Sequence, residues 1–276
     1  MRRRDGQGGI APPPDPPELP EAAGPRWPPW FAPASLFGSF AAIVVAGIPL
    51  LPVILTYGIS EALAGIALLA LLLVQDGLLV LAAVLFAAMK RRPRRWHFGI
   101  RATPLWPTVG WALLAFALMM AFEFGYVDLL GVDETNLDEL GEDNLVAGFA
   151  VSMAVIVVAP VAEEIFFRAF FYRALRTRLP VWPAALIDGI VFGLLHFQGI
   201  DTAIILPVIA GFGVGQCLVY ERTGSLFAVI AIHAAFNTVA MLSIAPLPAI
   251  LIGMSVLLGC VLVPPRAGRW PSPVPA

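Results

Sequence analysis

Two adjacent glutamates, Glu163 and Glu164, lie in an apolar stretch that also contains Arg168. This stretch, VVAPVAEEIFFRAFFYRAL, is otherwise hydrophobic enough to be a membrane-spanning helix. A carboxylate or guanidinium within the hydrocarbon layer costs about 2.5–3.5 kcal/mol on insertion scales, so such groups are candidates for a functional site. The chemistry that a carboxylate favours there is proton transfer.

The spacing of the three residues separates their roles. On a helix, Glu164 and Arg168 are four residues apart and share a face, which predicts an internal ion pair. Glu163 is rotated by about 100° and has no basic residue three or four positions away on its own helix. It must bind a proton or meet partners from other helices, so it is the better candidate for a general base. A packing network without catalysis is the alternative for all three.

Two further apolar segments carry histidines. The sequence FGLLH ends at His196, and HAAFN places His233 and Asn237 one helical turn apart. A polar contact between helices would explain each segment alone. Together with Glu163, however, these side chains supply what water-mediated amide hydrolysis requires. A carboxylate takes the proton of water, an imidazole orients the water, and two donors meet the oxyanion.

The elements that must position these residues are membrane spans. The chain has 276 residues, of which 59% are hydrophobic and 13% charged, whereas a soluble domain has roughly 25% charged residues. The sequence therefore predicts an all-α polytopic membrane protein, a bundle of about eight transmembrane helices. The expected spans are 35–58, 62–89, 105–128, 145–168, 183–199, 202–220, 225–243 and 247–264, the fourth continuing as an amphipathic tail.

The basic residues predict an orientation. With both termini in the cytoplasm, all of the 17 Lys and Arg residues except Arg168 lie on the cytoplasmic side. The acidic loop 132–144 then lies outside. We expect a disordered, proline-rich N-terminal arm over 1–33, the helical bundle over 34–265 and a tail over 266–276.

Three motifs carry a resemblance to a known family. EEIFFR at 163–168, FGLLH at 192–196 and HAAFN at 233–237 resemble, in order, the patterns EExxxR, FxxxH and HxxxN of the CPBP (Abi) family. These are intramembrane proteases related to the type II CAAX prenyl protease. The resemblance covers roughly residues 105–245 and implies a catalytic core there.

The resemblance also implies roles for the motif residues. Glu163 would activate the attacking water with the help of His196. His233 and Asn237 would stabilise the oxyanion, and Glu164 and Arg168 would hold the site.

The residues leave the use of a metal open. Glu163, His196 and His233 with a water would make a plausible three-ligand zinc site. The sequence lacks the HExxH pairing that places two histidines on one helix face, so we favour the metal-free mechanism.

The predicted function is that of an intramembrane endopeptidase with a cavity on the cytoplasmic side. It would act on a peptide or membrane-protein substrate within the lipid bilayer, in the inner membrane of a bacterial cell. The alternatives are a non-catalytic peptide-binding or bacteriocin-immunity protein and a proton-coupled transporter. Nothing in the sequence resembles a nucleic-acid-binding module.

Overall fold

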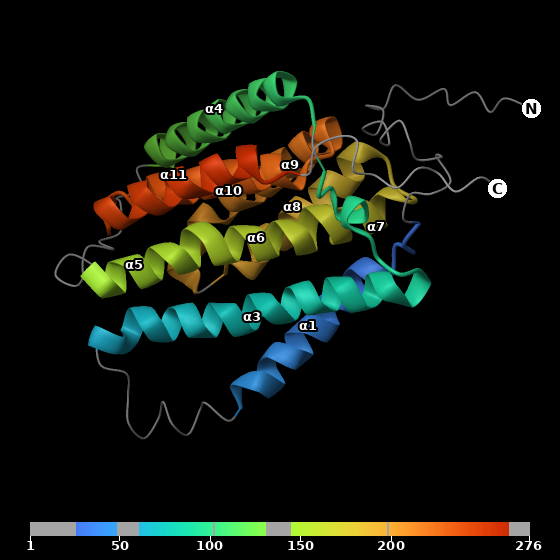
Figure 1. The fold of residues 1–276 in the computed structure, drawn as a ribbon, viewed down its shortest axis with the longest axis horizontal. Helices are drawn as coiled ribbons and strands as arrows, with labels where there is room; N and C mark the ends of the chain where they lie inside the picture. The colour runs from blue at the N-terminus through green and yellow to red at the C-terminus, as the bar shows by residue number, and fades with distance from the viewer. Residues whose placement is uncertain (1–25, 49–60, 102, 131–144, 198, 265–276) are drawn as a thin grey trace, which may run out of the picture.

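The computed structural model describes residues 26–48, 61–101, 103–130, 145–197 and 199–264. All regular secondary structure in these ranges is helical, and most of the helices run side by side (Figure 1). Four helical stretches are long and apolar enough to cross a membrane, and four more are apolar but shorter. The predicted all-α bundle of about eight membrane helices is therefore confirmed. The acidic loop 132–144 and the tail 266–276 lie outside the described residues.

The helices match the expected spans closely except for the first span, 35–58, most of whose second half lies outside the described residues. The long ones are α3 (Glu61–Lys90), α4 (Leu105–Leu130) and α9 (Leu206–Thr223), the last preceded by the short 3₁₀ helix η6 (Ile200–Ile205). The shorter apolar ones are α1 (Phe31–Gly47), α8 (Val181–Leu195), α10 (Leu226–Ala240) and α11 (Pro246–Leu262).

The fourth span is a single stretch of 32 residues, Leu145–Arg176, so the predicted continuation past residue 168 is confirmed. It alternates between α and π geometry: α5 (Leu145–Met153), η4 (Ala154–Val158, π), α6 (Ala159–Glu163), η5 (Glu164–Tyr172, π) and α7 (Arg173–Arg176). π-Bulges often occur at functional sites. Here the second π segment begins at Glu164 and includes Arg168, whereas Glu163 is the last residue of α6.

Pro160 explains the first π segment. A proline has no backbone N–H and crowds the carbonyl four residues before it, so the regular hydrogen-bond ladder cannot continue. The N–H of Ala159 instead bonds to the carbonyl of Ala154, five residues back. The carbonyl of Val155 is thereby left without a donor on its own helix, because residue 160 cannot supply one.

Glycines bring α8 and α9 into close contact. A Cβ atom added at Gly189 would lie 2.6 Å from the carbonyl oxygen of Ala210, and one at Gly193 would lie 3.0 Å from the backbone nitrogen of the same residue. Small residues allow such approach of helix backbones in membranes. The pair of helices therefore positions His196, which follows α8 directly.

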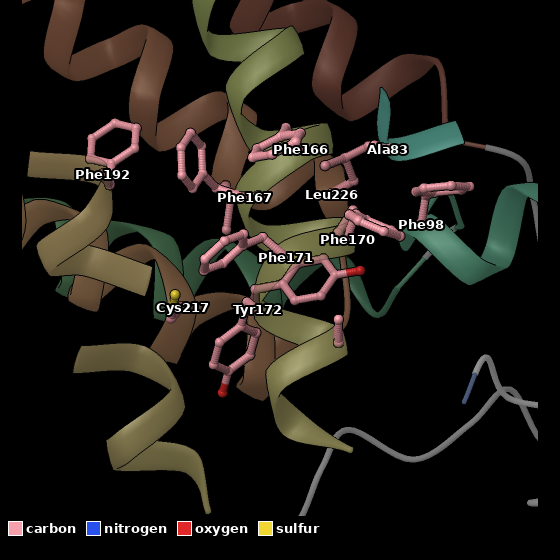
Figure 2. Close-up of a cluster of buried hydrophobic side chains, with 14 of the residues drawn as sticks. Ala83, Phe98, Phe166, Phe167, Phe170, Phe171, Tyr172, Phe192, Cys217 and Leu226 are labelled. Carbon is pink, nitrogen blue, oxygen red and sulfur yellow. The ribbon is translucent and has the colours of Figure 1, made fainter. Parts of the chain in front are cut away.

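Aromatic side chains form the core around the long helix. Four buried phenylalanines belong to the π segment η5: Phe166, Phe167, Phe170 and Phe171. Phe192 of α8 packs edge-on against Phe167 (Figure 2). These large side chains fill the space beside Glu164 and Arg168 with apolar surface. The polar side chains at the centre of the bundle therefore find their partners in one another and in backbone carbonyls of neighbouring helices.

The N-terminal boundary differs from the prediction of an arm over 1–33. Residues 1–25 lie outside the described part, but Trp27 is buried with its ring 4.9 Å from that of Phe170. Helix α1 already begins at Phe31. The aromatic residues bury enough apolar area to outweigh the surrounding prolines.

Except for Arg168, the basic residues that the structure describes lie toward one end of the bundle, which we call the basic end. Here α3 ends, α4 begins and α7 lies (Figure 1). Arg173 donates to the carbonyl of His97 at 2.9 Å, and Arg101 donates to the carbonyl of Gly224 at 3.0 Å. The segment after α3 thus contacts both α7 and the turn between α9 and α10.

Candidate active site

Glu164 lies at the centre of a buried polar network. Its Oε1 accepts from Nη1 of Arg168 at 3.1 Å, and both side chains are fully buried. The ion pair predicted from the spacing is therefore present. Nδ1 of His233 lies 2.8 Å from the same oxygen, and Nε2 of Gln216 lies 3.4 Å from it. Glu164 thus ties α9 and α10 to the long helix.

Arg168 is fully engaged by partners from neighbouring helices. Nη2 donates to the carbonyl of Gly213 at 3.3 Å, and Nε lies 3.7 Å from Oδ1 of Asp188. The guanidinium also stacks on the ring of Phe192, 4.4 Å from its centroid. Its charge is therefore compensated within the protein and serves to hold α8, α9 and the long helix together.

Glu163 faces a different partner. Its Oε2 lies 3.8 Å from Nε2 of His233, and only 15% of the glutamate side chain is exposed. That oxygen is buried and has no hydrogen-bond partner among the described residues. His233 is therefore placed between two glutamates, tied to Glu164 through one ring nitrogen and facing Glu163 with the other.

A backbone carbonyl determines which nitrogen of the His196 ring carries the proton. Nδ1 lies 2.8 Å from the carbonyl oxygen of Phe192. Because a carbonyl only accepts, Nδ1 carries the proton and Nε2 of the neutral ring is left as an acceptor. The Phe192 ring lies 4.7 Å from His196 and 6.0 Å from His233, so it separates and supports both imidazoles.

Asn237 donates a hydrogen bond to the carbonyl of Val155, which has no donor on its own helix because residue 160 is a proline. Its Nδ2 donates to the oxygen of Val155 at 2.7 Å. An amide nitrogen has two hydrogens, so one donor remains. The proline and the asparagine, 77 positions apart, are therefore linked through one backbone carbonyl.

His196, His233 and Asn237 line one cavity of about 250 Å³. The cavity is at the small end for ligand pockets. Its other walls are apolar except for Glu123 of α4; they consist of Val127, Phe192, Ile205, Val208, Ile209, Phe212, Phe236 and Ala240. Glu163 does not line this cavity. Its carboxylate faces Nε2 of His233, which does. The imidazoles of His196 and His233 therefore meet at one cavity.

The position of the cavity differs from the prediction. Its walls come from the last turns of α4, α8 and α10 and the first turns of α9, all far from the basic end. The cavity therefore lies toward the end of the bundle opposite the basic loops, whereas the sequence predicted a cavity on the cytoplasmic side, where those loops were placed. Span lengths alone do not predict the position of the cavity. Helix α8 begins at the basic end, so His196, which follows its last residue, lies toward the opposite end.

The sequence missed several members of the network. Gln216 donates to Glu164 and to the carbonyl of Val229, the latter at 2.8 Å. Asp188 accepts from Sγ of Cys217 at 3.1 Å and approaches Arg168. Both were visible as polar residues in apolar spans, which is the only signal that sequence offers for them.

Glu163, His196 and His233 are the three candidate ligands for a zinc ion. Among the described residues, no three His, Cys, Asp or Glu side chains are grouped as metal ligands. The hydrogen bonds of Nδ1 in His233 and His196 leave Nε2 of each ring available, so it is the spacing of the three side chains that is unlike a metal site. The arrangement of Glu163, His196 and His233 does not fit a three-ligand site, and we derive no step through a metal.

The fold and the site define an integral membrane protein with acid–base side chains buried in its helical bundle. Residues 145–239 match the family of the type II CAAX prenyl endopeptidase Rce1-like proteins. The match spans all three motifs and confirms the resemblance to the CPBP family over this segment. In general terms, such a family implies a protease that works on peptides in a lipid bilayer. A search of curated proteins and a search of solved structures each found no match.

Proposed function

We propose that this protein is an intramembrane endopeptidase in which Glu163 activates the water that attacks the peptide bond. The observation that carries the proposal is the position of His233 between two glutamates. Oε1 of Glu164 is held by Arg168, Gln216 and His233, whereas Glu163 has no basic residue closer than His233, 3.8 Å away, and its Oε2 has no hydrogen-bond partner among the described residues. The ion pair with Arg168 favours the charged form of Glu164, so Glu163 is the glutamate to which we assign the proton.

The first step is the attack of water. The separation of 3.8 Å between Glu163 and His233 is too long for a direct hydrogen bond. A water beside Glu163 would give its proton to the carboxylate and its oxygen to the carbonyl carbon of the substrate. Nε2 of His196, a lone-pair acceptor, would accept the second O–H of this water and orient it.

The oxyanion that forms needs donors. The remaining N–H of Asn237 is one, and Nε2 of His233 is the other when that ring is doubly protonated. Glu163 then returns its proton to the leaving amine. One water is consumed, and a carboxyl and an amine terminus are produced.

Glu164 and Arg168 act on this reaction through other residues. The pair fixes the His233 ring by its Nδ1 and connects three helices, so it is assigned a positioning role. Such a buried network holds its members within narrow limits, which proton transfer requires.

The setting we propose is the inner membrane of a bacterial cell, with both termini in the cytoplasm. The positive-inside rule supports this orientation, because the basic residues gather at one end of the bundle. The cavity then lies in the outer half of the membrane. A substrate segment within the membrane or beyond its outer surface would reach the site most directly.

Cysteine labelling in intact cells tests the orientation. In a Cys260→Ser background, Ser243→Cys places an exposed thiol between α10 and α11, and Arg92→Cys places one at the basic end. An impermeant maleimide should label position 243 in intact cells and position 92 only after lysis. The reverse pattern would refute the proposed orientation.

Peptide cleavage tests the function itself. Purified wild-type protein should cleave members of a fluorogenic apolar peptide library, and newly formed N-termini should appear in cells that carry it. Glu163→Gln should lose at least about a hundredfold in rate while the melting temperature stays unchanged. Asp128→Asn, an exposed acid on α4, is the matched control and should retain full rate. A Glu163→Gln variant with normal cleavage, or a cell phenotype that survives this substitution, would instead favour a peptide-binding protein.

A further inference from the structure

The cavity contains one ionisable side chain that the proposed mechanism does not use. Glu123 of α4 lines the same space as His196, His233 and Asn237. It is the only charged residue in the α4 sequence before Asp128. A carboxylate in an apolar span is unfavourable unless it is paired, so its presence requires a reason.

Packing of α4 holds Glu123 toward the interior of the bundle. Met119, one turn earlier, is buried against Gly215 of α9, and Phe122 packs on Gly211. One turn later, the hydroxyl of Tyr126 donates to the carbonyl of Ile204 at 2.8 Å. These contacts secure the α4 face that carries Glu123 against α9 and η6.

Glu123 has no hydrogen bond or ion pair with any other residue in the described ranges. No lysine or arginine lines the cavity. Arg168, the nearest candidate in the catalytic network, is already bound to Glu164, Gly213 and Asp188. A cation that entered the cavity would therefore find one carboxylate without a competing internal partner.

We propose that Glu123 is a specificity-determining residue that binds a lysine or arginine side chain of the substrate. The other walls of the cavity are apolar, so the preferred peptide has one basic residue among hydrophobic ones near the bond that is cut. The pairing would be formed away from bulk water, where a charged hydrogen bond is strong. This inference rests on the proposed function, because it takes the cavity to be the place where the substrate binds. Its test, however, does not require cleavage.

The test measures binding to full-length protein in detergent micelles. The Glu163→Gln variant serves as the background, so that hydrolysis does not interfere. Three fluorescent apolar peptides are compared that differ at one central position: lysine, N-acetyl-lysine or glutamate. Acetylation removes the charge and retains the stem of the side chain, so the comparison isolates the ion pair.

The lysine peptide should bind about tenfold to a hundredfold more tightly than the acetylated one. Glu123→Gln should abolish this difference, and Glu123→Lys should reverse the preference toward the glutamate peptide. Asp128→Asn removes the same charge from the same helix outside the cavity and should leave the preference unchanged. The melting temperature of each variant establishes that it is folded.

Equal binding of the lysine and acetyl-lysine peptides would overturn the proposal, as would a preference that survives Glu123→Gln. Absence of saturable binding by all three peptides would overturn it as well. Failure to cleave any peptide, with the charge preference intact, would instead count against the proposed hydrolysis and leave the role of Glu123 standing.

Discussion

Nδ1 of His233 lies 2.8 Å from Oε1 of Glu164, while the other nitrogen of the same ring faces Glu163. One histidine therefore connects a glutamate that is ion-paired with Arg168 to a second glutamate that lacks an ion pair with Arg168. The two adjacent glutamates occupy different environments although their sequence positions differ by one. Substitutions at the two positions should accordingly have different effects.

Glu164→Gln should reduce both stability and activity. The substitution removes one member of a buried ion pair and leaves Arg168 without its closest counter-charge, which costs about 3–5 kcal/mol. It also weakens the contact that orients His233. Thermal unfolding in detergent and peptide cleavage would measure the two effects, whereas Glu163→Gln should affect cleavage alone.

A double variant provides the control for this pair. Glu164→Gln combined with Arg168→Met leaves no unpaired buried charge, so its loss of stability should be smaller than the sum of the single losses. Additive losses would show that the two side chains act independently.

Gly189→Ala should separate α8 from α9. The added Cβ would lie 2.6 Å from both the carbonyl oxygen of Ala210 and Cγ2 of Val214, so backbone must move. Overpacking of this kind costs about 1–3 kcal/mol. The shift would also displace His196 at the end of α8, so we expect at least about a tenfold loss of cleavage rate, since small misplacements are costly.

Gly110→Ala on α4 is the matched control for Gly189→Ala. A Cβ atom at Gly110 would meet nothing within 4 Å, and alanine favours a helix over glycine. Stability and cleavage should therefore be unchanged or slightly improved. Equal damage from both substitutions would argue against close helix packing as the cause.

The loop at the basic end should make stability depend on pH. Burial, together with the positive charges of Arg173, Arg91 and Arg94, lowers the pKa of His97 from 6.5 to about 4. Nδ1 of the neutral ring accepts from the backbone N–H of Arg94 at 3.1 Å, and protonation would remove this bond. The folded protein thus keeps His97 neutral at a pH where the unfolded chain binds a proton.

The contribution of His97 is therefore complete above pH 6.5 and is lost as the pH falls toward 4. Its size is about 2 kcal/mol. Denaturation of wild type and His97→Gln at pH 7.5 and 4.5 would measure it, because other titrating groups are common to both proteins. Equal pH dependence in the two proteins would exclude His97 as the source.

Chelation distinguishes the two hydrolytic mechanisms that the motifs permit. The proposed reaction uses only protein side chains, so EDTA or 1,10-phenanthroline should leave the cleavage rate unchanged. A loss of activity that zinc restores would assign Glu163, His196 and His233 to a metal. The melting temperature should be measured with and without the chelator, so that a loss of activity through unfolding is not mistaken for the loss of a metal.

The sequence alone was sufficient to predict the helical bundle, the bounds of most of its spans to within a few residues, and the Glu164–Arg168 pair. These features are local. Apolar length determines a span, and helical periodicity places residues four apart on one face. The six motif residues were also found from sequence, because a charged or imidazole side chain stands out against apolar neighbours. Their catalytic roles remain predictions.

The tertiary structure alone decided which partners these residues meet. The helices here are apolar on most faces, so periodicity does not reveal how each is rotated or shifted against the next. The contacts of His233 with Glu164 and of Asn237 with the carbonyl that Pro160 leaves free depend on that rotation and shift. So does the location of the cavity, which lies away from the basic end and is lined by Glu123 together with His196, His233 and Asn237.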